Sequence, residues 1–260
     1  MNAHNARSNW IAFKTIIIKE VLRFSRIWIQ TILPPMITMG LYFVIFGGLI
    51  GSRIGEMDGI RYMDFIVPGL IMMAVITNAY ANVVSSFYSS KFQRHLEEML
   101  VSPVPNYLII LGFIGGGICR GLAVGVAVTL VSLLFSPFSI HNPAVALSVV
   151  VLTAALFSLA GLINGVFARS FDDISIIPTF ILTPLTYLGG VFYAVSLLPA
   201  FWQGVSMFNP ILYMVNAFRY GFLGVTDFNL WLSYGIIIGF ILILYATALY
   251  LLNKGIGIRQ

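Results

Sequence analysis

The sequence predicts an all-α polytopic membrane protein with six transmembrane helices and both termini in the cytoplasm. Hydrophobic residues make up 59% of the 260 residues and charged residues only 9%, whereas about 25% of the residues of a soluble domain are charged. The mean hydropathy is +0.96. So few charges cannot cover a surface that faces water. The composition therefore excludes a soluble enzyme, a disordered chain and a nucleic-acid-binding protein.

Motifs for catalysis, metal binding and ATP binding are missing from the sequence. Cys119 is the single cysteine, which excludes a disulfide framework. The histidines, His4, His95 and His141, are far apart and lack the spacing of metal ligands. No Gly-Lys pair occurs, so the chain has no Walker A motif for ATP. We expect no catalytic residue, metal or cofactor in this chain.

Long apolar runs, divided at proline-containing breaks, predict the six spanning helices. Each helix needs about 20 apolar residues to cross the hydrocarbon core. Ser136-Pro137 and His141-Asn142-Pro143 separate the third helix from the fourth. The helices belong to a single membrane domain, residues 1–260, and are expected at residues 27–50, 65–88, 106–135, 143–168, 174–194 and 230–252.

The distribution of positive charge predicts the orientation. Three basic residues fall on the segments assigned to the outside: Arg53, Arg61 and Arg219. Cytoplasmic segments carry an excess of Lys and Arg, which fixes both termini inside. The first span is too long for a signal-peptide core and is expected to be retained. The segments assigned to the inside hold Arg7, Lys14, Lys19, Arg23, Arg26, Lys91, Arg94, Arg169, Lys254 and Arg259.

Residues 8–26 predict an amphipathic helix on the cytoplasmic membrane surface, in contact with lipids. Lys19, Arg23 and Arg26 fall near one polar face of this helix. The alternative is a basic flank that only sets the orientation. The apolar face consists of side chains at helical spacing: Trp10, Phe13, Ile17, Val21 and Phe24.

Residues 89–105 form the most polar segment between two predicted spans. Leu96, Met99 and Leu100 give it a short apolar face, and Pro103 and Pro105 end the helix. Such a helix suits the docking of a cytoplasmic partner, but an ordinary connector fits the spacing equally well. The polar side chains around the apolar face are Lys91, Arg94, Glu97 and Glu98.

Residues 187–222 are apolar but are interrupted by Gly and Pro too often for one spanning helix. Irregular backbone at membrane depth must be buried in protein or line a water-filled cavity. We expect a broken re-entrant external segment, residues 195–222, made of two short helices that dip into the outer leaflet and return. A seventh crossing is the alternative, but it would place Lys254 and Arg259 outside.

Polar residues inside the spans allow two interpretations each. Asn78, Asn82, Ser85 and Ser89 fall near one face of the second span, either along a translocation path or in hydrogen bonds between helices. Arg120 is the one charge well inside a span, and it marks either a functional site or a hydrogen-bonding hub. No carboxylate lies near the middle of a predicted span, which argues against a proton- or sodium-coupled carrier.

Glycines four residues apart recur in three predicted spans. Such steps let helix backbones approach closely, so we expect helix packing at each of them. They are Gly117, Gly121 and Gly125 in the third span, Gly161 and Gly165 in the fourth, and Gly235 and Gly239 in the sixth.

Three motifs resemble those of the membrane subunit of ABC-2 type transporters. They are Phe65-Ile-Val-Pro-Gly-Leu-Ile-Met-Met, His95-Leu-Glu-Glu-Met-Leu-Val-Ser-Pro-Val-Pro, and Pro184-Leu-Thr-Tyr-Leu-Gly-Gly-Val-Phe-Tyr followed by Phe208-Asn-Pro and Phe218-Arg-Tyr-Gly. The predicted order of helices extends the resemblance over nearly the whole chain.

The resemblance implies partners and roles. The chain would pair with a second copy, and each copy would dock on a separate cytoplasmic ATP-binding cassette ATPase of the YadG type, which binds ATP and Mg. Residues 8–26 would be the connecting helix, with Lys19, Arg23 and Arg26. The second and fifth spans would line the path, with Asn78, Asn82, Thr183 and Tyr187. The coupling helix would be 91–102, with Lys91, Arg94, Leu96, Glu97, Glu98 and Leu100.

The function that follows is the permease subunit of an exporter in the bacterial inner membrane, driven by the partner ATPase. An amphipathic or lipid- or glycan-type substrate is expected, because related permeases carry such cargo. Two alternatives come from other classes: an ATP-independent lipid scramblase or carrier, and a membrane assembly subunit that transports nothing.

Overall fold

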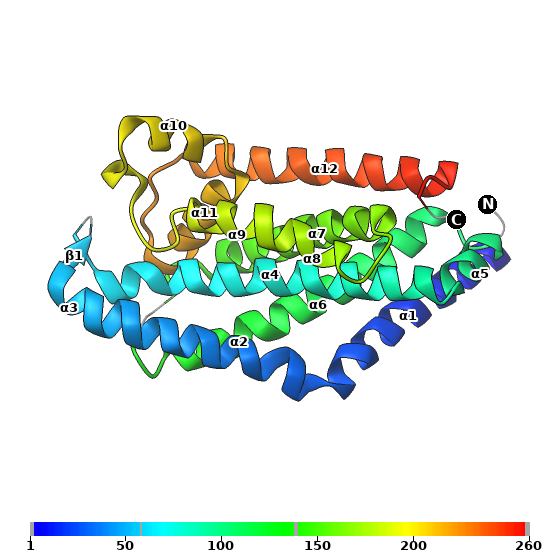
Figure 1. Cartoon of the computed structure of the whole chain (residues 1–260), viewed down its shortest axis with the longest axis horizontal. Coiled ribbons are helices and arrows are strands. Elements are labelled where there is room, and N and C mark those ends of the chain that lie inside the picture. Colours follow the sequence, from blue (N-terminus) through cyan, green and yellow to red (C-terminus); the bar gives the residue numbers. More distant parts are fainter. Residues whose placement is uncertain (1–2, 58, 138–139, 258–260) are drawn as a thin grey trace.

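The computed structural model describes residues 3–57, 59–137 and 140–257. Long helices lie side by side in an elongated bundle, and shorter helices cover its two ends (Figure 1). A two-stranded hairpin lies at one end, where Glu56 pairs with Arg61.

The elements are α1 (Ala3–Arg26), α2 (Trp28–Tyr42), η1 (Phe43–Ile50), α3 (Gly51–Ile54), β1 (Glu56–Met57), β2 (Ile60–Arg61), α4 (Tyr62–Phe92), α5 (His95–Val101), α6 (Asn106–Ser132), α7 (Pro143–Phe167), α8 (Asp173–Ile177), η2 (Pro178–Leu182), α9 (Thr183–Tyr187), η3 (Val195–Leu197), α10 (Ala200–Met207), α11 (Pro210–Leu223) and α12 (Leu230–Lys254).

Within the described residues, five helices are long and apolar enough to cross a membrane. The all-α polytopic class predicted from composition is therefore confirmed. The first of these helices is continuous from α2 through η1 to α3. They are Trp28–Ile54, Tyr62–Phe92, Asn106–Ser132, Pro143–Phe167 and Leu230–Lys254.

The predicted span 174–194 differs from the other five. Its helical part, α8 to α9, ends at Tyr187, and turns follow, with Gly190 at a φ of +70°. This run leads back from the end of α7 toward α10 at the opposite end of the bundle (Figure 1). Because it is shorter than the other five, the total of six spans stays a prediction.

Close packing surrounds α4, the central helix of the bundle. Gly117 of α6 and Gly161 of α7 face α4 where an added Cβ would collide, and an added Cβ at Gly121 of α6 would lie 3.2 Å from Ala79 of α4. A Cβ added to Gly161 would lie 2.6 Å from the carbonyl oxygen of Tyr80. The expected close packing is confirmed at these positions, and also at Gly125 and Gly165, whose nearest neighbours are Val75 and Phe87.

Within this chain, the same expectation is not met for α12. At Gly235 and Gly239, no described atom comes within 4 Å of an added Cβ. The glycine step in this helix therefore faces outward and does not bring two helices of this chain together. A four-residue glycine repeat marks a smooth helix face, but the sequence does not say what covers that face.

The segment predicted to be external, residues 195–222, contains the two short helices expected, α10 and α11. Asn209 begins α11 by accepting a hydrogen bond from the Ile211 N–H at 3.0 Å. Arg219, which we counted among external charges, is only 3% exposed. It donates to the Gly190 carbonyl at 2.7 Å, and its guanidinium lies 3.8 Å from the centre of the Phe65 ring. Arg219 therefore ties α11 to α4 and to the turn after α9.

Candidate functional site

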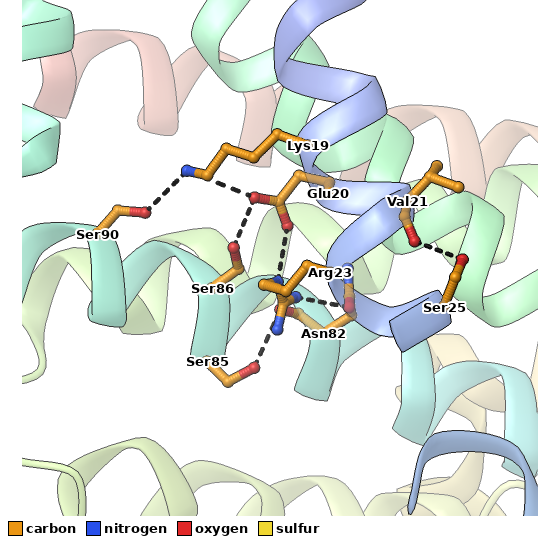
Figure 2. Close-up of polar contacts among 9 residues, drawn as sticks. All are labelled: Lys19, Glu20, Val21, Arg23, Ser25, Asn82, Ser85, Ser86 and Ser90. Carbon is orange, nitrogen blue, oxygen red and sulfur yellow. Dashed lines mark hydrogen bonds and ion pairs between the residues drawn. The ribbon is translucent and has the colours of Figure 1, made fainter. Parts of the chain in front are cut away.

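A buried carboxylate joins the N-terminal helix to the central helix. Glu20 of α1 is 0% exposed. Its two carboxylate oxygens accept from the Ser86 hydroxyl at 2.7 Å and from Arg23 Nε at 3.3 Å, as Figure 2 shows. Lys19 Nζ lies 4.0 Å from the same carboxylate. Hydrogen bonds and opposite charge together offset the cost of removing Glu20 from water.

The basic neighbours of Glu20 extend the contact along α4 (Figure 2). Arg23 Nη2 donates to the carbonyl of Asn82 at 3.0 Å and to its side-chain Oδ1 at 2.7 Å. Lys19 Nζ donates to Ser90 Oγ at 3.5 Å. Asn82, Ser86 and Ser90 are four residues apart, so one face of α4 binds one face of α1 over more than two turns.

Glycines of α6 make room for this contact. The positions that Cβ atoms would take at Gly112 and Gly116 are occupied by the side chains of Ile16 and Glu20. Among residues 7–26 of α1, the buried side chains are Ile16, Glu20 and Phe24, which are spaced four residues apart. The helix α1 therefore packs against the body of the protein through a face that has a carboxylate at its centre.

This face differs from the one predicted for residues 8–26. Trp10, at the start of the expected apolar face, is 63% exposed, and of that face only Phe24 is buried. Arg23 points inward to Asn82, whereas Arg26 is exposed and Lys19 about half exposed. The predicted apolar face is therefore left mostly uncovered by the rest of the chain, and its contact with the membrane surface stays a prediction. Arg23, which was expected on the polar face, instead points inward with Glu20.

Arg120 lies one turn beyond this contact. Its Nη2 donates to Asn78 Oδ1 at 3.2 Å. Asn78 and Asn82 are both buried, and each accepts from an arginine. Of the two alternatives for these asparagines, the structure contains the hydrogen bonds between helices.

The helix α5 forms the other part of this end of the bundle. Leu96 is fully buried in a cluster with Phe87, Ile109 and Phe113, and Met99 and Leu100 pack against the same cluster. The remaining side chains of α5, His95, Glu97, Glu98 and Val101, are exposed, as is Arg94 just before the helix. The apolar face predicted from spacing is therefore present, and it anchors the helix.

The bounds of α5 are narrower than the predicted 91–102. Arg94 adopts a φ of +63°, and this left-handed turn ends α4 and begins α5 at His95. Lys91 consequently belongs to the last turn of α4. Its Nζ donates to the carbonyls of Val166 at 2.7 Å and Ala168 at 2.8 Å. The lysine therefore supplies hydrogen bonds and positive charge to the backbone carbonyls at the C-terminal end of α7.

The loop after α7 is ordered by its own hydrogen bonds. Asp173 accepts from the backbone N–H of Arg169 at 2.8 Å and of Ser170 at 3.1 Å. The Arg169 N–H and the Ser170 hydroxyl hold the pKa of the Asp173 carboxyl below its usual range. This loop also contacts the end of α4, since the Phe171 ring centre lies 4.9 Å from that of Tyr88. The loop therefore packs against the end of α4, just before the chain turns into α5.

The four residues assigned to the path do not gather in one place. Asn78 and Asn82 are buried against α6 and α1, whereas Thr183 and Tyr187 are exposed on α9. The Thr183 hydroxyl donates within its own helical run, to the Pro178 carbonyl at 2.9 Å. The path assignment stays a prediction for all four.

The sequence matches the family described as ABC-2 type transporter over residues 11–223. The chain belongs to the ABC-2 type transporter family. The match contains α1 from residue 11 onward, the buried contact around Glu20, α5, and the two short helices α10 and α11.

Full-length relatives support the assignment. The chain is 61% identical to the inner membrane transport permease YadH of Escherichia coli K12, over 96% of this chain and 98% of that protein. It is 23% identical to nodulation protein J of Rhizobium leguminosarum bv. viciae, over 95% of this chain and 94% of that protein. It is 26% identical to nodulation protein J of Sinorhizobium fredii, over 82% and 78%.

This ABC-2 chain is therefore a permease-type membrane subunit, a multi-pass protein of the inner membrane. The buried residue of this candidate site that sequence reasoning missed is Glu20. A signal was available: Glu20 is four residues from both Ile16 and Phe24, so it shares a helix face with two apolar residues.

Proposed function

We propose that this chain is the permease subunit of an ATP-binding cassette exporter, with α5 as coupling helix and α1 as connecting helix. Two copies would pair, and each would dock on a separate cytoplasmic ATPase of the YadG type that binds ATP and Mg. The substrate would be an amphipathic, lipid- or glycan-type molecule moved outward across the inner membrane.

The observation that carries the proposal is the way α5 is anchored. Leu96 is fully buried, whereas Glu97 and Glu98 beside it are exposed on a seven-residue helix. A displacement of Glu97 and Glu98 by a docked partner would therefore be transmitted to the hydrophobic core through Leu96. Such a device suits a subunit whose energy source lies in another chain, since this sequence has no Walker A motif.

The helix α1 gives the same end of the bundle a second connection to the central helix. Glu20 and Arg23 bind Ser86 and Asn82, which lie in the cytoplasmic half of α4 under the proposed orientation. A displacement of α1 would be transmitted directly to α4. Both elements assigned to the ATPase interface are thus coupled to one spanning helix.

We further propose six crossings, with both termini in the cytoplasm. The start of α1 and the end of α12 lie at the same end of the bundle (Figure 1), as an even number of crossings requires. The run from α8 to α9 would supply the crossing beyond the five long helices. Its exposed side chains include Phe180 and Ile181, which suits contact with lipid or a second copy.

The coupling role predicts the effect of removing the acidic pair. In a reconstituted complex with its ATPase, the double variant Glu97→Ala, Glu98→Ala should transport at least about tenfold less substrate per ATP hydrolysed, since lost interfacial charge pairs cost on the order of 2 kcal/mol or more. The measurement is ATP hydrolysis and export side by side, with a panel of lipids and glycans as substrates.

The matched control is Glu56→Ala. Glu56 is also an exposed acidic residue, but it lies in the hairpin at the opposite end of the bundle. Export per ATP should be unchanged in this variant. Normal coupling in the Glu97, Glu98 variant would remove the coupling role of α5. Lipid movement without any ATPase would favour a scramblase, and no movement of any substrate would favour an assembly subunit.

A further inference from the structure

A groove opens between α6 and α7 in the half of the bundle away from α5. The two helices touch at Gly117, where an added Cβ would collide with Ser158. They are still in contact at Gly121, beside Ala154. One turn further along α6, no described atom of α7 comes within 4 Å of a Cβ added at Gly125. The helices therefore separate toward this end, and they leave a space of about 260 Å³.

The floor of this groove is made by two other helices. Ile71 of α4 and Phe218 and Phe222 of α11 line it and are only 1%, 2% and 4% exposed. Val126 of α6 and Leu147 of α7 stand at its mouth and are 61% and 62% exposed. A molecule that enters between α6 and α7 therefore reaches the central helix of the bundle.

The lining of the groove is almost wholly apolar. No charged side chain lines it, and its one hydroxyl, that of Thr129, already donates to the Gly125 carbonyl at 2.8 Å. Water in the groove would find no free polar side chain to bind. An apolar cavity of about 150 Å³ stays dry and binds benzene. This larger space therefore suits a hydrocarbon and not water.

The position of the groove decides which hydrocarbon can fill it. Both walls are helices long and apolar enough to cross a membrane, so lipid is the solvent at its mouth. A helix is about 10 Å wide with its side chains, which is too wide to pass between two neighbouring helices. An acyl chain is thin and flexible enough to follow the groove to Phe218. There it restores the van der Waals contacts that an empty groove would deny to its lining.

We propose that the groove between α6 and α7 binds one acyl chain of a membrane phospholipid. Under the proposed orientation, this chain comes from the outer leaflet. The bound chain lies between α6, α7 and α11 and touches α4 at Ile71. The site is at the opposite end of the bundle from α5, so it depends neither on ATPase docking nor on the transported substrate.

Two double variants test the site. Val126→Trp, Leu147→Trp places an indole on each wall of the mouth and should exclude the chain. The control is Leu242→Trp, Ile243→Trp, which adds the same bulk on α12 at side chains that are similarly exposed and lie outside the groove. Because all four positions are exposed, both variants should elute as monodisperse protein.

The measurement is photolabelling of the purified full-length permease in nanodiscs. The nanodiscs contain phosphatidylethanolamine with a diazirine in one acyl chain, and tandem mass spectrometry locates the label after irradiation. The readout is the share of all label that falls on Phe218 and Phe222. Bulk lipid does not reach these side chains, because they are almost fully buried, whereas a chain inside the groove lies against them.

The proposal predicts label on Phe218 and Phe222 in the wild type and in the α12 control. This label should be lost in Val126→Trp, Leu147→Trp, while exposed side chains of α12 stay labelled. Unlabelled Phe218 and Phe222 in the wild type would overturn the proposal without any variant. If Val126 and Leu147 were unlabelled too, a second copy or another protein would cover the mouth. Equal labelling of the floor in the mouth variant and the wild type would also overturn it.

Discussion

Replacing Glu20 by alanine should lower the free energy of unfolding by about 2–4 kcal/mol. Removing one partner of a buried ion pair leaves the other charge uncompensated, which costs about 3–5 kcal/mol when both groups are fully buried. Glu20 is 0% exposed, but the Arg23 side chain is 30% exposed, so we expect a cost about 1 kcal/mol smaller than that range. Ser86 also loses its acceptor. Thermal and denaturant unfolding of the detergent-solubilised protein measures the change.

A control and a double variant separate the ion pair from other effects. Glu97→Ala removes an exposed carboxylate of the same region and should change stability by no more than about 0.5 kcal/mol. The double variant Glu20→Met, Arg23→Met should recover part of the loss, because a well-packed apolar pair often replaces a buried ion pair without cost. If Glu20→Ala proved as stable as Glu97→Ala, the buried contact would not hold α1 in place.

The second large effect is expected at the contact of α4 and α7. Gly161→Ala should destabilise the protein by about 1–3 kcal/mol or more, because an added methyl group in a filled contact forces the helices apart. The obstacle is the carbonyl oxygen of Tyr80, only 2.6 Å from the new Cβ, and backbone cannot move aside as a flexible side chain can. The melting temperature and the yield of monodisperse protein report the change.

The matched substitution is Gly235→Ala in α12. No described atom lies within 4 Å of the added Cβ, so this variant should be neutral or more stable by about 0.5–1 kcal/mol, the usual gain of alanine over glycine inside a helix. Equal effects of Gly161→Ala and Gly235→Ala would contradict the packing of α4 against α7.

The long helices were predictable because each is an apolar run with clear breaks. Pro143 begins α7, with the Asn142 side chain accepting from the Val145 N–H, and the sequence His141-Asn142-Pro143 located that boundary. The segment 174–194 was harder, since its apolar residues continue to Ala194 whereas the helix ends at Tyr187. Hydropathy alone does not reveal the turn at Gly190, whose φ is positive.

The site was predictable only in part. Leu96, Glu97 and Glu98 follow from periodicity, but Arg94 takes a left-handed conformation that non-glycine residues rarely adopt, so the start of α5 could not be read from spacing. Glu20 was missed because a carboxylate in a basic amphipathic helix is expected to face water. Its burial depends on Gly112 and Gly116, almost a hundred residues further along the chain. The residues next to Glu20 in the sequence therefore do not reveal that distant glycines make room for its side chain.

Cross-linking at α5 tests the central claim that an ATPase docks there. The only cysteine is Cys119, so Cys119→Ser gives a background free of thiols. Into it, Glu98→Cys or Glu56→Cys is introduced, and the permease is co-expressed with its cassette ATPase and treated with a short thiol-reactive photo-cross-linker. The account predicts a permease–ATPase adduct from Glu98→Cys that is absent from Glu56→Cys. An adduct from Glu56→Cys alone, or none from Glu98→Cys in an assembled complex, would contradict it.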